Sequence, residues 1–218
     1  WLFLGLLAAF FGWRLDYHFW RPLAVPLLAG SVLLLLALFV PGVGSRVGGS
    51  TRWLRFGAVS VQPSEIAKFA IVVFLSWWMA RERRRAGTFK AGFLAPMGIT
   101  GLVILLILAE PDFGTTVLCG VVAMAVLFAG GARWFYLAGT ALLGGSGMAA
   151  LIYHDPVRAT RILAFLDPEK YAETCGYQLI GALNAFITGG LFGRGLSKGV
   201  QKHFYLPESH TDFIFAVV

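Results

Sequence analysis

Residues 23–40 read LAVPLLAGSVLLLLALFV, 18 consecutive residues without a charged side chain. A helix of roughly 20 apolar residues crosses the hydrocarbon core of a bilayer, which is about 30 Å thick. Comparable apolar runs recur along the chain, and in lipid only a helix satisfies all backbone polar groups within one open segment. The expected spans are at about 1–13, 23–40, 63–80, 91–109, 115–130 and 134–153, with a seventh starting at 213. The sequence therefore predicts an all-α polytopic membrane protein, with one transmembrane domain over 1–218 and about six complete spans.

The composition supports a membrane protein and argues against a nucleic-acid partner. Hydrophobic residues make up 58% of the 218 residues and charged residues 13%, and the mean hydropathy is +0.75. Soluble domains have about 25% charged residues. The net charge of +7 is typical of nucleic-acid binding only when it forms a basic face. Here Lys and Arg lie in short loops between apolar runs, so membrane topology explains them better.

The basic residues predict the orientation in the membrane. Eight of them lie in alternate short connections: Arg14, Arg21, Arg81, Arg83, Arg84, Arg85, Lys90 and Arg133. The short connections on the opposite side hold only Arg46, Arg52 and Arg55. Cytoplasmic loops carry the excess of Lys and Arg, and long loops do not count because they translocate regardless of charge. The side with eight basic residues is therefore expected to be cytoplasmic.

The opposite side is expected to carry a long extracytoplasmic loop at 154–212. Loops of this length without predicted structure are often functional. The chain begins at Trp1 and stops within an apolar run at Val218, so we expect it to be an internal fragment. With this topology, several ionisable residues fall at the outer ends of their segments: Arg52, Arg55, Glu65, Lys68, Glu110, Asp112, Glu208 and Asp212.

Glu65 and Lys68 open the third apolar run and allow two interpretations. Pro63 suits the first position of a helix, and a carboxylate in the first turn complements the helix dipole. Neither role explains Lys68, because a cation at membrane depth costs about 2.5–3.5 kcal/mol at the centre of a span. A spacing of three places both side chains on one helix face. They are expected either to neutralise each other between helices or to bind an anion.

Two further carboxylates flank apolar runs. Asp112 is expected mainly to cap the helix that follows it, whereas Glu110 ends an apolar run and has no such explanation. Asp212 directly precedes the seventh apolar run, and on pattern alone an N-cap is favoured. Desolvation at a water–lipid boundary would also make Asp212 a stronger base for a hydroxyl. His210 could carry protons, although a histidine satisfied by the backbone is the commoner case.

Six ordered motifs resemble the SEDS family (shape, elongation, division and sporulation). They are RW at 52–53, QPSEIAK at 62–68, EPDFGT at 110–115, RILAFLDP at 161–168, GYQ at 176–178 and LPESHTDFIFA at 206–216. The motifs VQK at 200–202 and YLPE at 205–208 are more similar to the division branch than to the elongation branch. The resemblance covers essentially the whole chain. It implies a helical bundle of about ten spans in the complete protein.

The resemblance also implies a glycosyltransferase of the bacterial inner membrane that polymerises lipid II into glycan strands on the outer face. Asp212 matches the aspartate at which the family's activity is placed, and it would deprotonate the acceptor sugar hydroxyl. The expected substrate-binding residues are Arg52, Lys68, Arg161, Glu208 and His210. Arg52, Lys68 and Arg161 would stabilise the departing pyrophosphate. Glu65 and Glu110 would not contact the substrate but would hold the substrate-binding residues in place. A divalent cation (Mg²⁺ or Mn²⁺) could assist, although no cluster of ligands in the sequence requires one.

Other functions and the expected partners complete the sequence-based hypothesis. A flippase or transporter of lipid-linked precursors would favour charges at mid-depth in broken helices, and a non-catalytic divisome scaffold would need the charge of neither Lys68 nor Asp212. The resemblance implies a class B penicillin-binding transpeptidase as partner, together with other divisome or elongasome proteins. Lipid II and the growing glycan strand are the expected substrates.

Overall fold

The computed structural model describes residues 2–47, 50–56, 59–190 and 193. It divides the chain into two compact units, 1–141 and 142–218, called here the first and the second unit. The sequence predicted a single transmembrane domain, and that organisation stays a prediction. Glu208, His210 and Asp212 lie outside the described residues.

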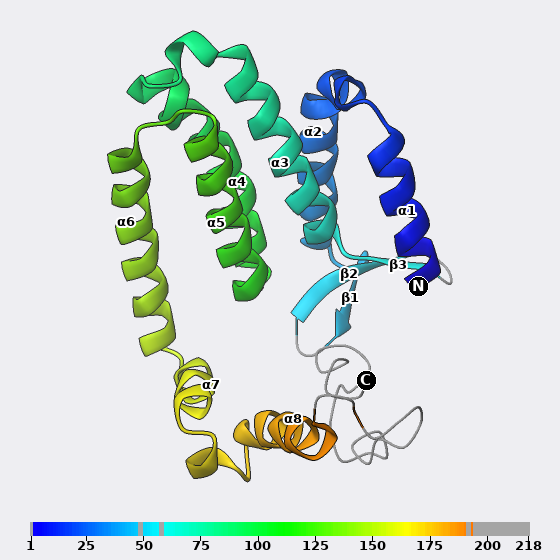
Figure 1. Cartoon of the computed structure of the whole chain (residues 1–218), viewed down its shortest axis with the longest axis vertical. Helices are drawn as coiled ribbons and strands as arrows, with labels where there is room; N and C mark the ends of the chain where they lie inside the picture. The colour runs from blue at the N-terminus through cyan, green and yellow to red at the C-terminus, as the bar shows by residue number, and fades with distance from the viewer. Residues whose placement is uncertain (1, 48–49, 57–58, 191–192, 194–218) are drawn as a thin grey trace. The chain divides into compact units, whose positions relative to one another are not determined.

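The first unit is built from apolar helices (Figure 1). These are α1 (Leu2–Arg14), α2 (Trp20–Leu38, preceded by the 3-10 turn η1, Tyr17–Phe19), α3 (Pro63–Arg81), α4 (Ala95–Ala109) and α5 (Phe113–Ala129). The turn η2 (Arg83–Arg85) and the π-helical turn η3 (Lys90–Leu94) connect α3 to α4, and α6 (Trp134–Tyr153) runs into the second unit. Among the described residues, four helices are long and apolar enough to span a membrane: Tyr17–Leu38, Pro63–Arg81, Lys90–Ala109 and Trp134–Tyr153. The chain is therefore a multi-pass membrane protein, and α1 and α5 are apolar but shorter.

Local sequence signals explain where these helices begin and end. Pro63 occupies the first turn of α3, where its missing N–H costs no hydrogen bond. Asp112 is the N-cap of α5 and accepts a hydrogen bond from the Thr115 N–H at 3.3 Å, as the sequence predicted. Gly131 follows the end of α5 with a φ of +97°, a conformation that favours glycine and closes a helix C-terminus.

The core of the first unit lies where α3 packs against α2, α4 and α5. Ala67 and Ala70 on α3 are fully buried, and small residues at such positions let helix backbones approach closely within a membrane. Ile71 on α3 is fully buried in the same cluster, with Leu35 from α2 and Ile107 from α4. This packing fixes α3 at the centre of the unit, so that the residues at its two ends are held in place.

A small sheet joins α2 to α3, where the sequence analysis expected only a short connection. It contains β1 (Gly44–Val47), β2 (Ser50–Phe56) and β3 (Val59–Val61) in the order β1-β2-β3, and both pairings are antiparallel. Leu54 on β2 is buried, with 2% of its surface exposed. Gln62 is the only residue between β3 and α3, so the sheet positions β2 directly beside the start of α3.

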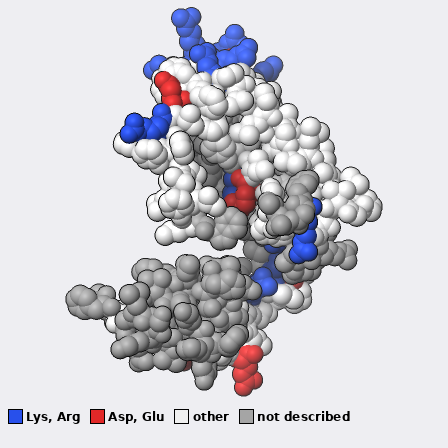
Figure 2. Space-filling model, turned by 90° about the vertical axis from the view of Figure 1, so that its right-hand side faces the viewer, with Lys and Arg blue, Asp and Glu red and all other residues white. Residues whose placement is uncertain are grey.

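Most of the basic residues of the first unit gather at one end of the helices. Figure 2 shows Lys and Arg crowded at the upper end of the view. Arg14 ends α1, Arg81 ends α3, and Arg83–Arg85 form η2. Because β2 and the starts of α3 and α5 lie at the other end (Figure 1), the two ends differ in charge as the sequence predicted. The assignment of the basic end to the cytoplasm stays a prediction.

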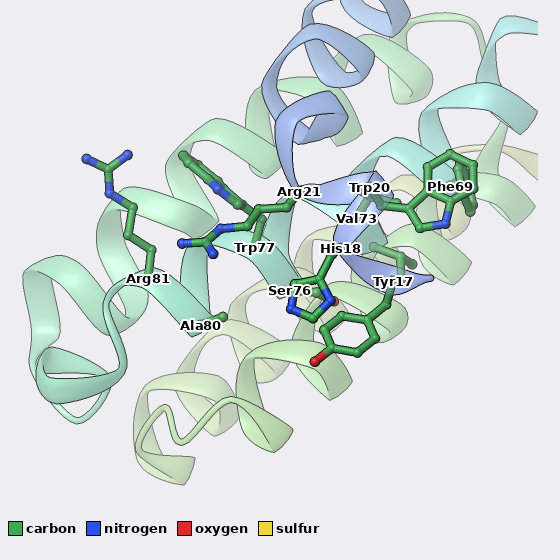
Figure 3. A pocket seen from close by; sticks show the side chains of 11 residues that line it. Tyr17, His18, Trp20, Arg21, Phe69, Val73, Ser76, Trp77, Ala80 and Arg81 are labelled. Carbon is green, nitrogen blue, oxygen red and sulfur yellow. The ribbon is translucent and has the colours of Figure 1, made fainter. Parts of the chain in front are cut away.

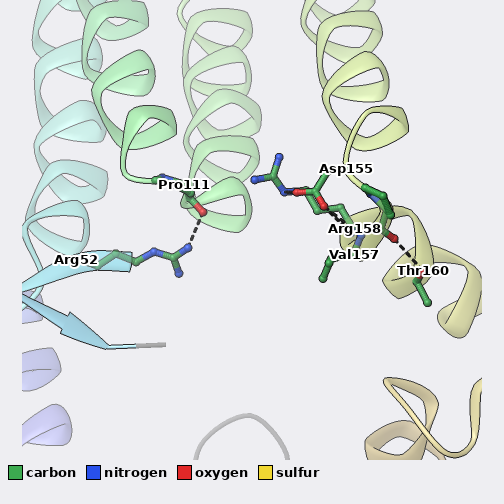
Figure 4. A network of polar contacts seen from close by, with 7 residues as sticks. Arg52, Pro111, Asp155, Val157, Arg158 and Thr160 are labelled. Carbon is green, nitrogen blue, oxygen red and sulfur yellow. Dashed lines mark hydrogen bonds and ion pairs between the residues drawn. The ribbon is translucent and has the colours of Figure 1, made fainter. Parts of the chain in front are cut away.

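The second unit contains two helices within the predicted long loop. These are α7 (Pro156–Leu166) and α8 (Gly176–Gly189), with the 3-10 turn η4 (Glu169–Tyr171) between them. Asp155 caps α7 by accepting the backbone N–H of Val157 at 3.0 Å, and it also pairs with the Arg158 side chain at 2.9 Å (Figure 4). The part of this loop that the structure describes is therefore largely helical, which the sequence periodicity did not predict.

Replacing Gly92 with alanine is expected to destabilise the turn between α3 and α4. A Cβ at Gly92 would lie 1.7 Å from the backbone oxygen of Ala86, and a backbone atom cannot move aside as a flexible side chain can. Overpacking of this kind costs about 1–3 kcal/mol, sometimes more. Thermal unfolding in detergent measures the loss. Gly98→Ala is the matched control because nothing lies within 4 Å of a Cβ there, and an equal loss in both variants would contradict the prediction.

Candidate active site at one end of the helices

Arg52 on β2 binds the turn between α4 and α5. Its Nε donates to the carbonyl oxygen of Glu110 at 3.3 Å, and its Nη2 donates to that of Pro111 at 2.5 Å (Figure 4). Carbonyl groups at a helix C-terminus lack partners within the helix and carry partial negative charge. The arginine therefore ties the sheet to the end of α4, although it is separated from these residues by 58 and 59 positions in the sequence.

Asp112 joins the same turn to the start of α3. Besides capping α5, its carboxylate accepts a hydrogen bond from Gln62 Nε2 at 3.4 Å, and Gln62 also donates to Ser64 Oγ at 3.0 Å. The Thr116 hydroxyl donates to the Asp112 backbone oxygen at 2.6 Å. These bonds hold the N-terminal ends of α3 and α5 side by side.

Glu110 is buried in this turn without a partner. It is 4% exposed, and among the described residues neither carboxylate oxygen has a hydrogen-bond partner. It follows the last residue of α4 and lies outside the spanning segment. Burial, reinforced by the negative charge of Asp112 and opposed by Arg52, raises the pKa of Glu110 from 4.5 to about 7. Near neutral pH this carboxyl group can therefore hold or release a proton.

Glu110→Gln is expected to remove a pH dependence of stability. Below pH 4.5 the carboxyl is protonated in both the folded and the unfolded protein. Between pH 4.5 and about 7 the unfolded state loses the proton first, so stability falls as pH rises and is level above that range. The loss is at most about 3.5 kcal/mol, at about 1.4 kcal/mol for each pKa unit.

Thermal unfolding in detergent at pH 5 and pH 8 measures this dependence. The wild-type protein should lose more stability over this range than Glu110→Gln does. Glu169→Gln, at an exposed position in η4, should behave like the wild type. Equal pH dependence in the wild type and Glu110→Gln would show that Glu110 ionises normally.

Glu65 and Lys68 form an ion pair on α3, with Lys68 Nζ 2.8 Å from Glu65 Oε1. The pairing that their spacing predicted is confirmed. The pair is accessible, because the side chains of Lys68 and Glu65 are 29% and 56% exposed. Lys68 also lines a cleft of about 230 Å³ between α3 and α5, together with Val72, Leu118 and Cys119. The lysine thus keeps its stem against apolar residues and its charged head on Glu65, as long basic side chains commonly do at interfaces.

Six polar residues at this end of the first unit are called here the polar cluster: Arg52, Gln62, Glu65, Lys68, Glu110 and Asp112. Gln62 lies immediately before α3 and Asp112 immediately before α5, and Lys68 lies about 8 Å along α3 from its first residue at 1.5 Å per residue. Two cations and three carboxylates thus lie at the end of the helices opposite the basic loops. Hydrogen bonds join Arg52 to the α4–α5 turn and Gln62 to Asp112, and Lys68 pairs with Glu65. Such a cluster can bind an anion through its cations and transfer a proton through its raised-pKa carboxyl group.

Comparison with known proteins identifies the family. The family model described as "Cell cycle protein", which groups FtsW, RodA and SpoVE, matches residues 1–218. The chain belongs to the FtsW/RodA/SpoVE family. This confirms the resemblance to SEDS proteins.

Curated members of the FtsW/RodA/SpoVE family resemble the chain over its entire length. It is 46% identical to "Probable peptidoglycan glycosyltransferase FtsW" of Nitrosococcus halophilus and 43% identical to the protein of the same name from Legionella pneumophila, with 100% of the chain covered in both. It covers 56% and 55% of these proteins. The chain therefore spans about half the length of the curated relatives it matches, and it is FtsW-like, as the motifs predicted.

Solved structures of the family share the fold. The crystal structure of the rod shape determining protein RodA from Thermus thermophilus is 30% identical, with a TM-score of 0.56, over 69% of this chain and 48% of that chain. A chain from a structure titled "Structural coordination of polymerization and crosslinking by a peptidoglycan synthase complex" is 27% identical, with a TM-score of 0.66, over 99% of this chain and 59% of that chain. These similarities confirm the predicted SEDS-type helical membrane bundle, to which the structure adds the small sheet before α3.

The predicted site residues of this SEDS protein fall into three groups: residues in the polar cluster, a residue in the second unit and residues outside the described part of the chain. Arg52, Lys68, Glu65 and Glu110 lie in the polar cluster of the first unit. Arg161 is exposed on α7 in the second unit, and its role stays a prediction, as do the roles of the predicted residues outside the described part of the chain. Within that part no group of three or more His, Cys, Asp or Glu residues could hold a metal ion, so no metal ligand is assigned.

Gln62 is the residue of the cluster that the sequence analysis missed. In the sequence Gln62 stands out only as the first residue of the motif QPSEIAK at 62–68. Its position next to Pro63, at the start of a helix, offered a signal, because side chains that flank a helix N-terminus often bind neighbouring backbone or side-chain groups. Its partner Asp112 lies 50 positions away, and sequence pattern alone does not reveal that contact.

Proposed function

We propose that the complete protein is a peptidoglycan glycosyltransferase that polymerises lipid II on the outer face of the bacterial inner membrane. The observation that carries this proposal is the polar cluster, in which Arg52 and the Glu65–Lys68 pair lie at the helix end opposite the basic loops. The names of the curated FtsW relatives support it. Under the positive-inside rule, the cluster faces the outside of the cell, where lipid II would be polymerised.

The cations of the cluster suit the pyrophosphate of lipid II. Arg52 has five N–H donors, and it uses Nε and Nη2 for the carbonyl groups of the turn. Lys68 has three donors and is paired with a single carboxylate among the described residues. Both side chains thus keep donors for a phosphate, and charge-assisted hydrogen bonds of this type are about twice as strong as neutral ones.

The apolar cleft beside Lys68 suits the polyprenyl chain. It is lined by Ile71 and Val72 from α3 and by Leu118 and Val122 from α5. An apolar tail entering this cleft would place its pyrophosphate near the charged end of Lys68. Tail and head group would then be recognised side by side, as a lipid-linked substrate requires.

The proposed reaction is an inverting displacement. Asp212 removes the proton from the acceptor 4-hydroxyl, whose oxygen attacks the anomeric carbon of the donor sugar. The bond from that carbon to the pyrophosphate oxygen breaks, and the leaving undecaprenyl pyrophosphate carries the electron pair. Lys68, Arg52 and Arg161 stabilise this charge, and Glu208 and His210 contact the substrate. Glu65 orients Lys68, and Glu110 supports the turn that Arg52 binds.

The proposed partners follow from the same activity. Newly made glycan strands need crosslinking, so we place a class B penicillin-binding transpeptidase and other divisome or elongasome proteins beside this protein. The structural relative from a complex of polymerisation and crosslinking supports such a pairing. The FtsW names of the curated relatives favour a role in division.

One assay distinguishes the polymerase from a flippase and from a scaffold. The complete protein is placed in proteoliposomes with fluorescent lipid II, and glycan products are separated on a gel while lipid movement is followed by chemical quenching. The proposal predicts polymer. Lipid movement without polymer would instead identify a flippase, and neither activity in the presence of the transpeptidase would identify a scaffold.

A further inference from the structure

A second pocket lies at the basic end of the first unit, away from the polar cluster. It has a volume of about 450 Å³, within the range of about 300–1,000 Å³ typical of pockets for small organic ligands. It is formed by η1 and the start of α2 on one side and by residues 69–81 of α3 on the other (Figure 3). None of its lining residues belongs to the polar cluster, although Phe69 and Val72 also line the cleft beside Lys68.

The pocket is as deep as one leaflet of a bilayer. Along α3 its lining extends from Phe69 to Arg81, which is about 18 Å at 1.5 Å per residue. Half of the hydrocarbon core is about 15 Å. Because Arg81 is the last residue of α3, the pocket begins at the basic surface of the membrane and ends near its middle.

The two ends of the pocket differ in chemistry. Arg21 and Arg81 lie toward its surface end, whereas Phe69 and Val73 lie toward its deep end (Figure 3). Trp20 packs edge-on against Phe69, with ring centroids 5.0 Å apart. The pocket thus offers cations at the depth of lipid head groups and apolar surface at the depth of acyl chains.

The surface end of the pocket has the features of an anion-binding site. The Arg81 guanidinium lies over the Trp77 ring, 5.4 Å from its centroid, which restricts its orientation. No carboxylate is among the described residues that line the pocket. Asp16, next to η1, directs its carboxylate to His18, accepting the backbone N–H at 2.8 Å and contacting Nδ1 at 2.7 Å. Neither arginine that lines the pocket pairs with this acid.

We propose that this pocket binds an anionic glycerophospholipid of the leaflet at the basic end. The lipid phosphate accepts hydrogen bonds from Arg21 and Arg81, and one acyl chain lies against Phe69 and Val73. Guanidinium groups match phosphate oxygens in a paired geometry, and basic pockets between spans on this side of a membrane favour anionic head groups. A transmembrane helix would fit this charge pattern only by bringing acidic residues to the same depth.

Lipid retention by the purified complete protein tests the charge requirement. Native mass spectrometry is carried out after incubation with phosphatidylglycerol or with phosphatidylcholine. The wild-type protein should retain phosphatidylglycerol preferentially. Arg21→Gln and Arg81→Gln should each lower its apparent affinity about fivefold, and the double variant more. Arg83→Gln/Arg84→Gln is the matched control for the Arg21→Gln/Arg81→Gln double variant. It also removes two positive charges, but from η2, at positions that do not line the pocket.

A substitution that fills the pocket with a large side chain tests whether the lipid binds at this site. Ser76 lines the pocket and is exposed, so Ser76→Trp should exclude the lipid while leaving both arginines in place. Ser146→Trp, at an exposed position on α6, should retain it. A photoreactive acyl chain on phosphatidylglycerol should crosslink to α3 in the wild type and not in Ser76→Trp.

Three results would overturn the proposal. Equal retention of the two lipids would show a pocket without charge preference. Equal loss in the Arg83→Gln/Arg84→Gln control would show attraction by the basic surface as a whole. Lipid crosslinks that avoid α3 would show that the lipid does not occupy the pocket, and crosslinking that Ser76→Trp leaves unchanged would show that the lipid contacts α3 outside it.

Discussion

Asp212→Asn is expected to abolish glycan polymerisation by the complete protein. The amide has nearly the shape of the carboxylate but cannot accept the proton of the acceptor hydroxyl. Loss of a general base costs about 10²- to 10⁴-fold in rate. The measurement is the initial rate of polymer formation from fluorescent lipid II, with binding of lipid II followed separately. Binding should change little because the hydrogen-bonding surface is nearly preserved.

The control for this prediction removes a different carboxylate from the same loop. Glu173 is exposed between η4 and α8, and Glu173→Gln should polymerise at the wild-type rate. Thermal unfolding of both variants shows whether the fold is intact. Wild-type polymerisation by a folded Asp212→Asn protein would remove Asp212 as the base.

Lys68→Met is expected to lower the polymerisation rate at saturating lipid II by about 10²- to 10³-fold, the effect of removing one group that stabilises charge in the transition state. Methionine keeps an apolar chain in the cleft between α3 and α5, so the packing around Val72 and Leu118 should survive. The variant loses only the charge that faces Glu65. The rate is measured as a function of lipid II concentration, which separates kcat from KM.

The double variant Glu65→Gln/Lys68→Met distinguishes the two interpretations of this pair. If Lys68 only neutralises Glu65, removing both charges should restore the activity that Lys68→Met lost. If Lys68 binds the pyrophosphate, the double variant should remain inactive, which is the result we expect. Lys90→Met, in η3 at the opposite end of the helices, should leave the rate unchanged. Recovery in the double variant would assign the pair a structural role.

The sequence allowed several features of the polar cluster to be predicted because they depend on neighbours in the chain. The Glu65–Lys68 contact needs only a spacing of three on a helix, and the cap at Asp112 needs only a carboxylate before an apolar run. Contacts between distant segments could not be predicted in this way. Arg52 on the carbonyl groups of the α4–α5 turn and Gln62 on Asp112 join residues that are 50 or more positions apart.

The sheet and the helices of the long loop also depend on contacts or signals that the sequence pattern did not reveal. Alternation of charged and apolar residues in 44–61 is interrupted by glycines, and the antiparallel pairing of β1, β2 and β3 depends on contacts with α2 and α3. Helix α7 carries a recognisable cap at Asp155, but it is short and mixed in polarity. For that reason hydropathy gave no signal of its ends.

By itself the sequence determined the membrane class, the charge difference between the two ends and the family. The membrane class follows from the cost of moving polar groups into lipid, which acts on each segment separately. The charge difference follows from the Lys and Arg residues of the short loops, and the family follows from motifs that are each local in the sequence. Only the tertiary structure decided that Glu110 is buried without a partner, that Arg52 closes the turn beside it, and that Arg21 and Arg81 border one pocket. Burial and the meeting of distant side chains arise when helices pack, and packing is a property of all the segments together.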